Sequence, residues 1–384
     1  MIKDFKVTSF LFHNFVTTFN FFFITYILFI LSFSGYVSLA GEAFIVLSII
    51  QLFTLGLSSN LRNIYIANKK IIPFEKIISF RILIGIMSFM ISCILVFYFI
   101  GSINISFHIP LILLAVLSWI FEIILAKNEL EKKINNLFLY NLFCFTVITP
   151  IVIILTSIDI LIILILSYCF LNVLIFRKYL FQTPHLIINS FQVHLKNFKL
   201  GISSTLLKYI SNFIWRYLIF FLIGSYKAGL LFLAFSMGSF LGTLFDVSYG
   251  AFFNKSSNNN RNYFLYFFIF GYVLALILFL NIISPYFKIS ASDLYFLNNA
   301  FIPSIIGGII MVHVLIIRQK LFEKINFQKI CFKTDIIGYL MVILSVPILF
   351  YINEAYVIYA YLLNSSFLYL IYILVSNVSF KINK

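Results

Sequence analysis

The sequence predicts an all-α polytopic membrane protein with about twelve transmembrane helices in two six-helix bundles. Two observations concern composition: 62% of the 384 residues are hydrophobic, whereas only 10% are charged. The third is that apolar runs of the length that a membrane helix needs, about 18 residues or more, recur along the whole chain. A soluble globular fold is excluded by this composition.

The predicted helices follow one another with short loops, because twelve spans of about 20 residues use most of the chain. The divisions at Ser157–Asp159 and at Asn353–Glu354 are the least marked. We expect the helices over residues 10–33, 38–58, 77–100, 108–126, 137–156, 160–176, 200–224, 229–253, 263–283, 298–317, 334–351 and 356–376.

The positions of the basic residues predict the orientation. By our count, 23 of the 27 Lys and Arg residues fall at the ends and loops on the side of the N-terminus, Arg81 and Arg318 among them. Lys227 and Lys288 fall on the other side. Because cytoplasmic loops carry an excess of Lys and Arg, we expect both termini to lie in the cytoplasm. The formal net charge of +15 is therefore a topology signal, and nucleic acid is not expected as a partner.

The longest hydrophilic segment divides the chain near its midpoint. Residues 177–199 contain Pro184, His185 and His194 and are predicted to be a cytoplasmic linker. The linker separates an N-terminal six-helix bundle, residues 1–176, from a C-terminal six-helix bundle, residues 200–384.

A short internal repeat supports this division into halves. Ser34-Gly35-Tyr36, followed by Ala40-Gly41 and Phe44, resembles Gly224-Ser225-Tyr226, followed by Ala228-Gly229 and Phe232. The two Ala-Gly pairs are 188 residues apart (228 − 40 = 188). Each half has six spans, so the repeats would be parallel, as in several transporter folds.

A polar stripe within one predicted helix is the main candidate site. Ser204, Lys208, Asn212 and Arg216 are spaced i, i+4, i+8 and i+12, so a helix places them on one side. A charge at the bilayer centre costs roughly 2.5–3.5 kcal/mol on insertion scales. We predict that the stripe lines an aqueous cavity and binds an anionic group. The alternative is that Lys208 pairs with an acid and Arg216 extends to the outer interface.

Asp246, on the next predicted helix, is the expected partner of Lys208. The two helices form a hairpin whose turn centres near residue 226 or 227, which brings Lys208 level with about residue 245. The same construction sets Arg216 opposite Met237 and Gly238, where there is no acid. Arg216 is therefore the sharper candidate for an anionic ligand.

Four further charged residues are weaker candidates. Glu122 is expected to pair with Arg81, and the alternative is that it carries a coupling proton. Arg62 and Arg81 bracket the first inner loop and could contact a phosphate that enters from the cytoplasm, although topology explains them equally well. Glu42 begins a helix on the outer side, where solvation at the interface is the simpler explanation.

No cofactor, metal site or catalytic set is predicted. The four cysteines have no paired spacing, and the two linker histidines, nine residues apart, are a poor metal signature. The sequence has no G-x-x-x-x-G-K-[ST] loop and no Ser/His/Asp or Cys/His set in an ordered loop, so we do not expect an enzyme.

Two stretches resemble a known family. AGEAFIVLSIIQLFTLGLSSNLRNIYIANKK in the first half and KAGLLFLAFSMGSFLGTLFDVSYGAFF in the second are similar to the O-antigen-unit flippases (Wzx type) of the multidrug/oligosaccharidyl-lipid/polysaccharide exporter superfamily. The shared pattern is a turn containing glycine, a helix of small and apolar residues, and a polar inner end.

The resemblance implies a function in surface polysaccharide or lipopolysaccharide biosynthesis. It implies a central cavity that opens alternately to each side, with a cationic lumen, and Lys208 and Arg216 suit that lumen. The implied substrate is an undecaprenyl-pyrophosphate-linked oligosaccharide, and a polysaccharide polymerase and a chain-length regulator are possible partners. The resemblance also implies coupling to an ion gradient.

Two other functions stay open at this point. A cation-coupled multidrug exporter of the same fold would be expected to carry buried acids for its cationic cargo, whereas the stripe presents cations. An O-antigen polymerase, which is a membrane glycosyltransferase, would be expected to have a large outer loop, and no predicted outer loop exceeds about 20 residues.

Overall fold

The computed structural model describes residues 23–58, 65, 74–101, 104–131, 157–181, 187–252, 271, 290–322 and 328–382. Over these residues the chain forms helices and turns and no strand. Seven helices among them are long and apolar enough to cross a membrane. The chain is therefore an all-α polytopic membrane protein, as its sequence predicts.

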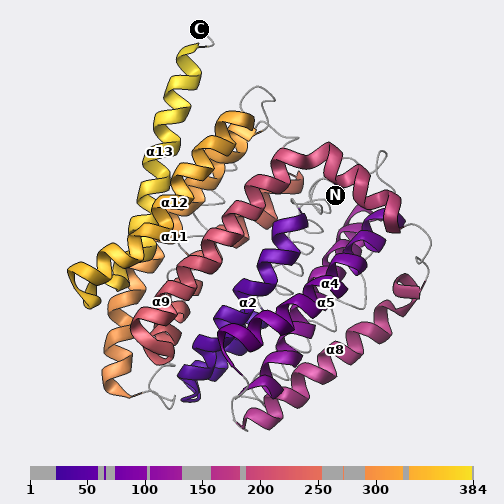
Figure 1. Cartoon of the computed structure of the whole chain (residues 1–384), viewed down its shortest axis with the longest axis horizontal. Coiled ribbons are helices and arrows are strands. Elements are labelled where there is room, and N and C mark those ends of the chain that lie inside the picture. The colour runs from indigo at the N-terminus through magenta and orange to yellow at the C-terminus, as the bar shows by residue number, and fades with distance from the viewer. Residues whose placement is uncertain are drawn as a thin grey trace. The chain divides into compact units, whose positions relative to one another are not determined.

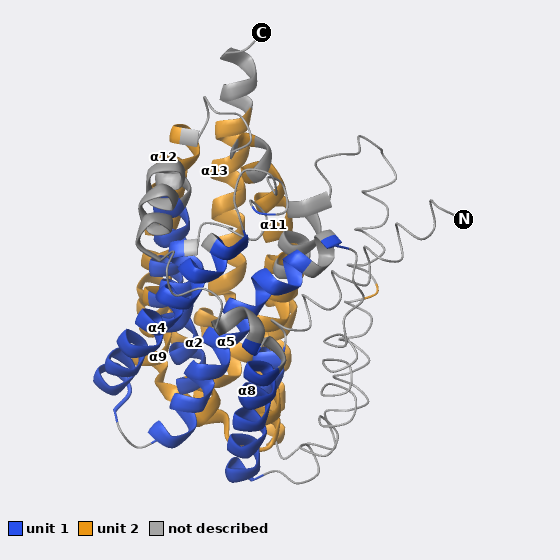
Figure 2. Cartoon of the chain, turned by 90° about the vertical axis from the view of Figure 1, so that its right-hand side faces the viewer, with its two compact units in different colours: residues 1–28, 42–213 blue, residues 29–41, 214–384 orange. Residues whose placement is uncertain are grey.

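The chain divides into two compact units, which Figure 2 colours separately. Unit 1 comprises residues 1–28 and 42–213, and unit 2 comprises residues 29–41 and 214–384. All three boundaries fall inside helices: one in the helical segment Phe23–Phe33, one in α2 (Val37–Ser58) and one in α9 (Ile187–Phe252). Each of these helices therefore contributes residues to both units.

Three helices of unit 1 pack side by side, namely α4 (Phe74–Phe99), α5 (Ile105–Glu131) and α8 (Ile158–Phe181) (Figure 1). The central helix is α5. In the most apolar 18-residue segment of α5, 83% is buried, whereas in that of α4 only 28% is buried. Beyond the first turn, which contains the exposed Glu75, exposed apolar side chains of α4 recur every three or four residues, as in Ile86, Met90, Ile94 and Phe97. A helix face of this kind is suited to contact lipid chains.

The described helices at the C-terminal end of unit 2 are α11 (Ala291–Phe322), α12 (Gln328–Ile352) and α13 (Ala360–Ile382). Both α11 and α12 pack against α13. Between α12 and α13 the chain makes the 3₁₀ turn η7 (Glu354–Tyr359), whose first N–H groups need an acceptor. Asn353 supplies it, because its Oδ1 accepts a hydrogen bond of 2.9 Å from the Ala355 N–H. The predicted division at Asn353–Glu354 is confirmed.

The two spans predicted over 200–224 and 229–253 belong to one element, α9, which turns back on itself. In a straight helix, residues 20 positions apart are about 30 Å apart, yet the ring centres of Trp215 and Phe235 are only 5.2 Å apart. The reversal occurs at Gly224, whose φ is +80°. The predicted hairpin is therefore present, and its turn lies close to the expected position.

Replacing Gly224 tests the backbone of this turn. A Cβ at residue 224 would have nothing within 4 Å, so its cost comes from the left-handed conformation alone. We expect Gly224→Ala to lower the free energy of unfolding by about 1–2 kcal/mol, and Gly224→Asn to lower it less, because Asn tolerates this conformation. Unfolding of the purified chain in mixed micelles measures both. A stabilising Gly224→Ala, as at an ordinary helical glycine, would contradict this conformation.

The two copies of the predicted repeat contact each other within unit 2. A Cβ on Gly41 would lie 2.3 Å from the main-chain oxygen of Ser225, and a Cβ on Gly229 would lie 2.2 Å from that of Val37. The contact is reciprocal, since each oxygen belongs to the residue four positions before the other glycine, and both pairs are separated alike (225 − 37 = 188 and 229 − 41 = 188). The hydroxyls of Ser38 and Ser225 are 2.6 Å apart at the same place. Only glycine permits this approach of two backbones.

The remaining predicted spans agree with the structure where it describes them. The spans over 38–58, 77–100, 108–126, 160–176, 298–317, 334–351 and 356–376 correspond to α2, α4, α5, α8, α11, α12 and α13. Of the span over 10–33, the part Phe23–Phe33 is described and is helical. The spans over 137–156 and 263–283 lie outside the described residues except for Gly271, so a total of twelve stays a prediction.

Candidate functional site

The four residues of the predicted polar stripe all lie in α9. Ser204 is buried, and Lys208, Asn212 and Arg216 are half-buried. The helix is continuous through them, so the i, i+4 spacing places them on one side of α9. The ammonium of Lys208 lies 5.5 Å from the ring centre of Tyr209, a distance suited to a cation–π interaction.

Arg216 lies beside a series of aromatic contacts in unit 2. The ring of Trp215 packs against Phe235, and Phe235 stacks on Tyr361 of α13 with ring centres 5.7 Å apart. Arg216 interacts electrostatically with Tyr361. A guanidinium offers five N–H donors in a planar fork that matches phosphate oxygens. This part of α9 therefore combines a half-buried cation with aromatic rings from two helices.

Two of the predicted site residues cannot be placed. The backbone of Asp246 belongs to α9, but its side chain lies outside the described part of the chain. Its pairing with Lys208 stays a prediction. Arg62 also lies outside the described residues.

Glu122 and Arg81 form a buried ion pair between α5 and α4. Nη1 of Arg81 donates to Oε2 of Glu122 at 2.8 Å, and it also donates to the main-chain oxygen of Trp119. The guanidinium carbon is 4.8 Å from the centre of the Trp119 ring. Arg81, the partner that we expected for Glu122, is the partner observed in the structure. The Arg81 side chain is only 1% exposed, which favours a role in joining the two helices over one in meeting a ligand at an entrance.

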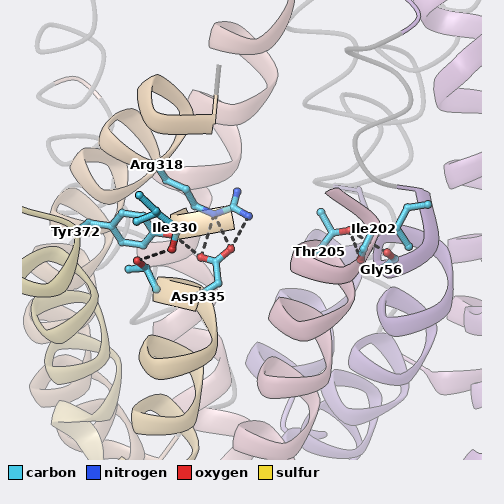
Figure 3. Close-up of polar contacts among 8 residues, drawn as sticks. Gly56, Ile202, Thr205, Arg318, Ile330, Asp335 and Tyr372 are labelled. Atoms are coloured by element: carbon cyan, nitrogen blue, oxygen red, sulfur yellow. Dashed lines mark hydrogen bonds and ion pairs between the residues drawn. The ribbon is translucent and has the colours of Figure 1, made fainter. Parts of the chain in front are cut away.

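A second buried ion pair, in unit 2, is absent from our sequence predictions. Arg318 of α11 contacts Asp335 of α12, with Nη2 to Oδ2 at 3.1 Å and Nε to Oδ1 at 3.2 Å (Figure 3). The hydroxyl of Tyr372 on α13 donates to Oδ1 of the same carboxylate. Asp335 is fully buried, whereas the Arg318 side chain is 18% exposed. This cluster joins the three C-terminal helices of unit 2.

A third polar cluster, in unit 1, changes the interpretation of Glu42. Its Oε2 accepts a hydrogen bond of 2.7 Å from Nδ2 of Asn104 and lies 3.1 Å from Nε2 of His108. The His108 side chain is fully buried, and that of Glu42 is 17% exposed. Solvation alone therefore does not account for Glu42. The three residues are 62 and 66 positions apart along the chain, so only the packing of α2 beside the start of α5 reveals the cluster.

A close crossing within unit 1 places the stripe helix against α2. The hydroxyl of Thr205 donates to the main-chain oxygen of Gly56 at 2.9 Å, and is also 3.0 Å from that of Ile202 (Figure 3). A Cβ on Gly56 would lie 3.1 Å from Leu206. Gly56 on α2 and the hydroxyl of Thr205 on α9 thus allow the two helices to approach each other closely, at the position next to Ser204.

The described residues contain no group of three or more His, Cys, Asp or Glu that could hold a metal ion. Among them Cys93, Cys169 and Cys331 are free thiols. Comparisons with protein-family models, with curated proteins and with solved structures give no match, so the function has to be argued from these residues.

Proposed function

We propose that the chain is a flippase for an undecaprenyl-pyrophosphate-linked oligosaccharide, such as an O-antigen unit. It would move the lipid from the cytoplasmic to the periplasmic leaflet of the bacterial inner membrane by alternating access. Under this proposal both termini are cytoplasmic and the activity is transport, not catalysis. A polysaccharide polymerase and a chain-length regulator would act on the product.

The observation that carries the proposal is the position of Arg216. It is half-buried in an apolar helix, and it interacts with Tyr361, whose ring stacks on Phe235, which in turn packs against Trp215. An arginine inside a membrane segment is expensive and usually serves a polar pathway or a ligand. A pyrophosphate headgroup is an anion that a guanidinium fork recognises, and Lys208, two turns earlier on the same side of α9, adds a second cation.

Two properties of the chain support a transporter. The helices α4 and α12 present apolar faces, as expected of lipid-facing helices. The reciprocal contact of the repeats supports an internally duplicated fold, which is common among transporters. These properties do not by themselves identify the cargo. The headgroup charge that Arg216 would recognise argues for an anionic lipid over a cationic drug.

The first test removes the charge of Arg216. In cells that make the cognate lipid-linked unit, we expect Arg216→Ala to lower its exposure to an outside probe at least tenfold, to the level of cells without the protein. Arg216→Lys should retain part of the activity, because it keeps the charge and loses the fork. The matched control is Lys227→Ala, which removes an exposed cation, 54% accessible, from the turn of the same hairpin.

The outcomes separate the site from the function. Normal exposure of the lipid with Arg216→Ala at normal expression would leave a flippase with a different site. Equal exposure in cells without the protein, together with loss of long polymer, would replace the proposal by a polymerase. Accumulation of a cationic dye in cells without the protein, with lipid exposure unchanged, would replace it by a multidrug exporter.

A further inference from the structure

Exposed tyrosines gather at one end of unit 2. They belong to the turn of α9, the start of α11, the end of α12 and the turn η7. Each is at least 41% exposed, and we call the set the tyrosine band: Tyr226, Tyr295, Tyr351, Tyr356 and Tyr359. The Tyr226 hydroxyl donates to Oδ2 of Asp293 in α11 at 2.5 Å. Beside it, Nζ of Lys227 lies 2.6 Å from Oε1 of Glu354 in η7. These two contacts join the elements, so the band occupies a single end of the unit.

The exposed face of α12 leads away from this band. From Lys333 to Tyr351 the exposed residues follow the helical repeat of three to four positions, so they lie along one side of the helix. All those between the two ends are apolar, namely Ile337, Leu340, Met341, Leu344 and Ile348. Lys333 and Tyr351 are 18 residues apart (351 − 333 = 18), which is about 27 Å along a helix and close to the ~30 Å of a bilayer hydrocarbon core. One side of α12 thus has a cation at one end, a phenol at the other and only apolar groups across the thickness of a membrane.

The faces of α13 and α11 begin in the same way. Beyond Tyr359, the exposed residues of α13 up to residue 376 are Leu363, Phe367, Leu370 and Leu374. Beyond Tyr295, those of α11 up to residue 318 are Asn298 and Asn299, followed by Ile302 and Ile306. All three helices therefore pass from tyrosine, at the end that carries the band, to apolar side chains further along.

An exposed tyrosine at the end of a membrane helix is suited to the interface between lipid and water. Its ring is apolar and its hydroxyl is polar, so tyrosine is enriched at the level of the lipid headgroups. Within the described part of the chain, the hydroxyls of the four band tyrosines other than Tyr226 form no hydrogen bond. Ile352, which is 63% exposed, lies between Tyr351 and the polar residues Asn353 and Glu354. This mixture of exposed rings, hydroxyls and an aliphatic side chain suits neither bulk water nor the hydrocarbon core.

We propose that the tyrosine band binds the headgroup and glycerol region of the lipid leaflet at this end of unit 2, which the predicted orientation makes the outer leaflet. The rings pack against the acyl chains nearest the glycerol, and the hydroxyls donate to ester and phosphate oxygens of the phospholipids. At the other end of the α12 face, Lys333 extends to the headgroups of the opposite leaflet. Asp293, Lys227 and Glu354 are then in contact with headgroups and water, where charge costs little. The inference requires no particular cargo, so it is independent of the proposed flippase.

The first test measures the depth of residues along the exposed face of α12. The full chain is made without its four cysteines, and single cysteines that carry a nitroxide spin label are introduced at exposed positions. The labelled chain is placed in phospholipid nanodiscs. Collisions of the label with oxygen, which concentrates in hydrocarbon, and with a water-soluble nickel chelate give its depth. We expect the deepest labels in Leu340→Cys and Leu344→Cys, and labels at the two headgroup levels in Tyr351→Cys and Lys333→Cys.

The matched control is a label at the first residue of α11, in Ala291→Cys. Ala291 is exposed and lies four residues before Tyr295, so its label should be as open to the nickel chelate as one in water. Equal access of the chelate to Tyr351→Cys and Ala291→Cys would place the band in water and overturn the proposal. A label in Tyr351→Cys that neither reagent reaches would also overturn it, in favour of a second copy or another protein that covers the band.

A second experiment asks whether the tyrosines hold the end of α12 at this depth. The reporter is a label in Ile348→Cys, combined with changes at Tyr351, Tyr356 and Tyr359. With leucine at all three positions the helix end loses its hydroxyls, so we expect the label to sink by at least one helical residue, about 1.5 Å. With tryptophan at all three the preference for the interface is kept, and the depth should not change. An unchanged depth in the leucine variant would show that the band lies in the interface without binding it.

Discussion

Replacing Asp335 by leucine is expected to lower the free energy of unfolding by about 3–5 kcal/mol, because the change leaves the Arg318 guanidinium without its carboxylate inside unit 2. The carboxylate of Asp335 is fully buried and accepts hydrogen bonds from Arg318 and from the Tyr372 hydroxyl. The variant thus removes the partner of a charge and of a buried hydroxyl at once. Unfolding in mixed micelles, followed by the loss of helical signal, gives the free energy.

Two companion variants show whether the loss of stability comes from an unpaired buried charge or from any change at this position. The double variant with Arg318→Met and Asp335→Leu removes both charges, and we expect it to recover most of the loss, since apolar replacements of a buried pair are often neutral. The matched control is Lys227→Ala, which breaks the pair of 2.6 Å with Glu354. Both of these side chains are about half exposed, so the expected loss is below about 1 kcal/mol. A double variant as unstable as Asp335→Leu would contradict this account of the pair.

Gly238→Ala is expected to destabilise unit 2 by about 3 kcal/mol, the upper part of the usual range for overpacking. A Cβ at this position would lie 2.0 Å from the main-chain oxygen of Ser304, and a Cβ on Gly308 would lie 2.1 Å from that of Gly238. The second limb of α9 and α11 therefore cross in direct backbone contact. Because the obstructing atoms belong to the backbone, the helices themselves must move apart.

Gly242, one turn further along α9, provides the control with the opposite sign. A Cβ at Gly242 would meet only the Leu315 side chain, at an ordinary 3.5 Å. We expect Gly242→Ala to be neutral or to stabilise the chain by up to about 1 kcal/mol, because alanine is the better helix former. The same unfolding measurement compares the two variants. Equal effects of Gly238→Ala and Gly242→Ala would show that the crossing is looser than described.

The helices could be predicted from the sequence because a membrane span is a local property. Apolar length is sufficient to find α4 and α12, whose lipid-facing side chains need no partner in the chain. The turn of α9 was also predictable, since Gly224 and the residues after it interrupt a long apolar run. The bounds of α9 differ from the prediction because the structure includes both predicted spans, and the residues before them from Ile187, in one element.

The buried polar contacts were less predictable, because each depends on which helices are neighbours. The count of basic residues predicts that Arg81 and Arg318 lie on the cytoplasmic side, but the positions of the charges in the sequence give no sign that each has a buried acid as a partner. Glu122 could be paired with Arg81 because both lie near the ends of adjacent helices. Asp335 and His108 carried no such signal, since their partners are 17 and 66 residues away on helices whose packing the sequence does not specify.

The reciprocal contact of Gly41 and Gly229 limits how this sequence can change over time. In most packed interfaces, an enlarged side chain on one helix can be accommodated by a smaller one on its neighbour. Here the obstructing atoms are the main-chain oxygens of Val37 and Ser225, which every residue type carries. No substitution in one repeat can therefore make room for a larger residue in the other. The two glycines are each irreplaceable for the same reason, and neither can be rescued by a second mutation at its partner.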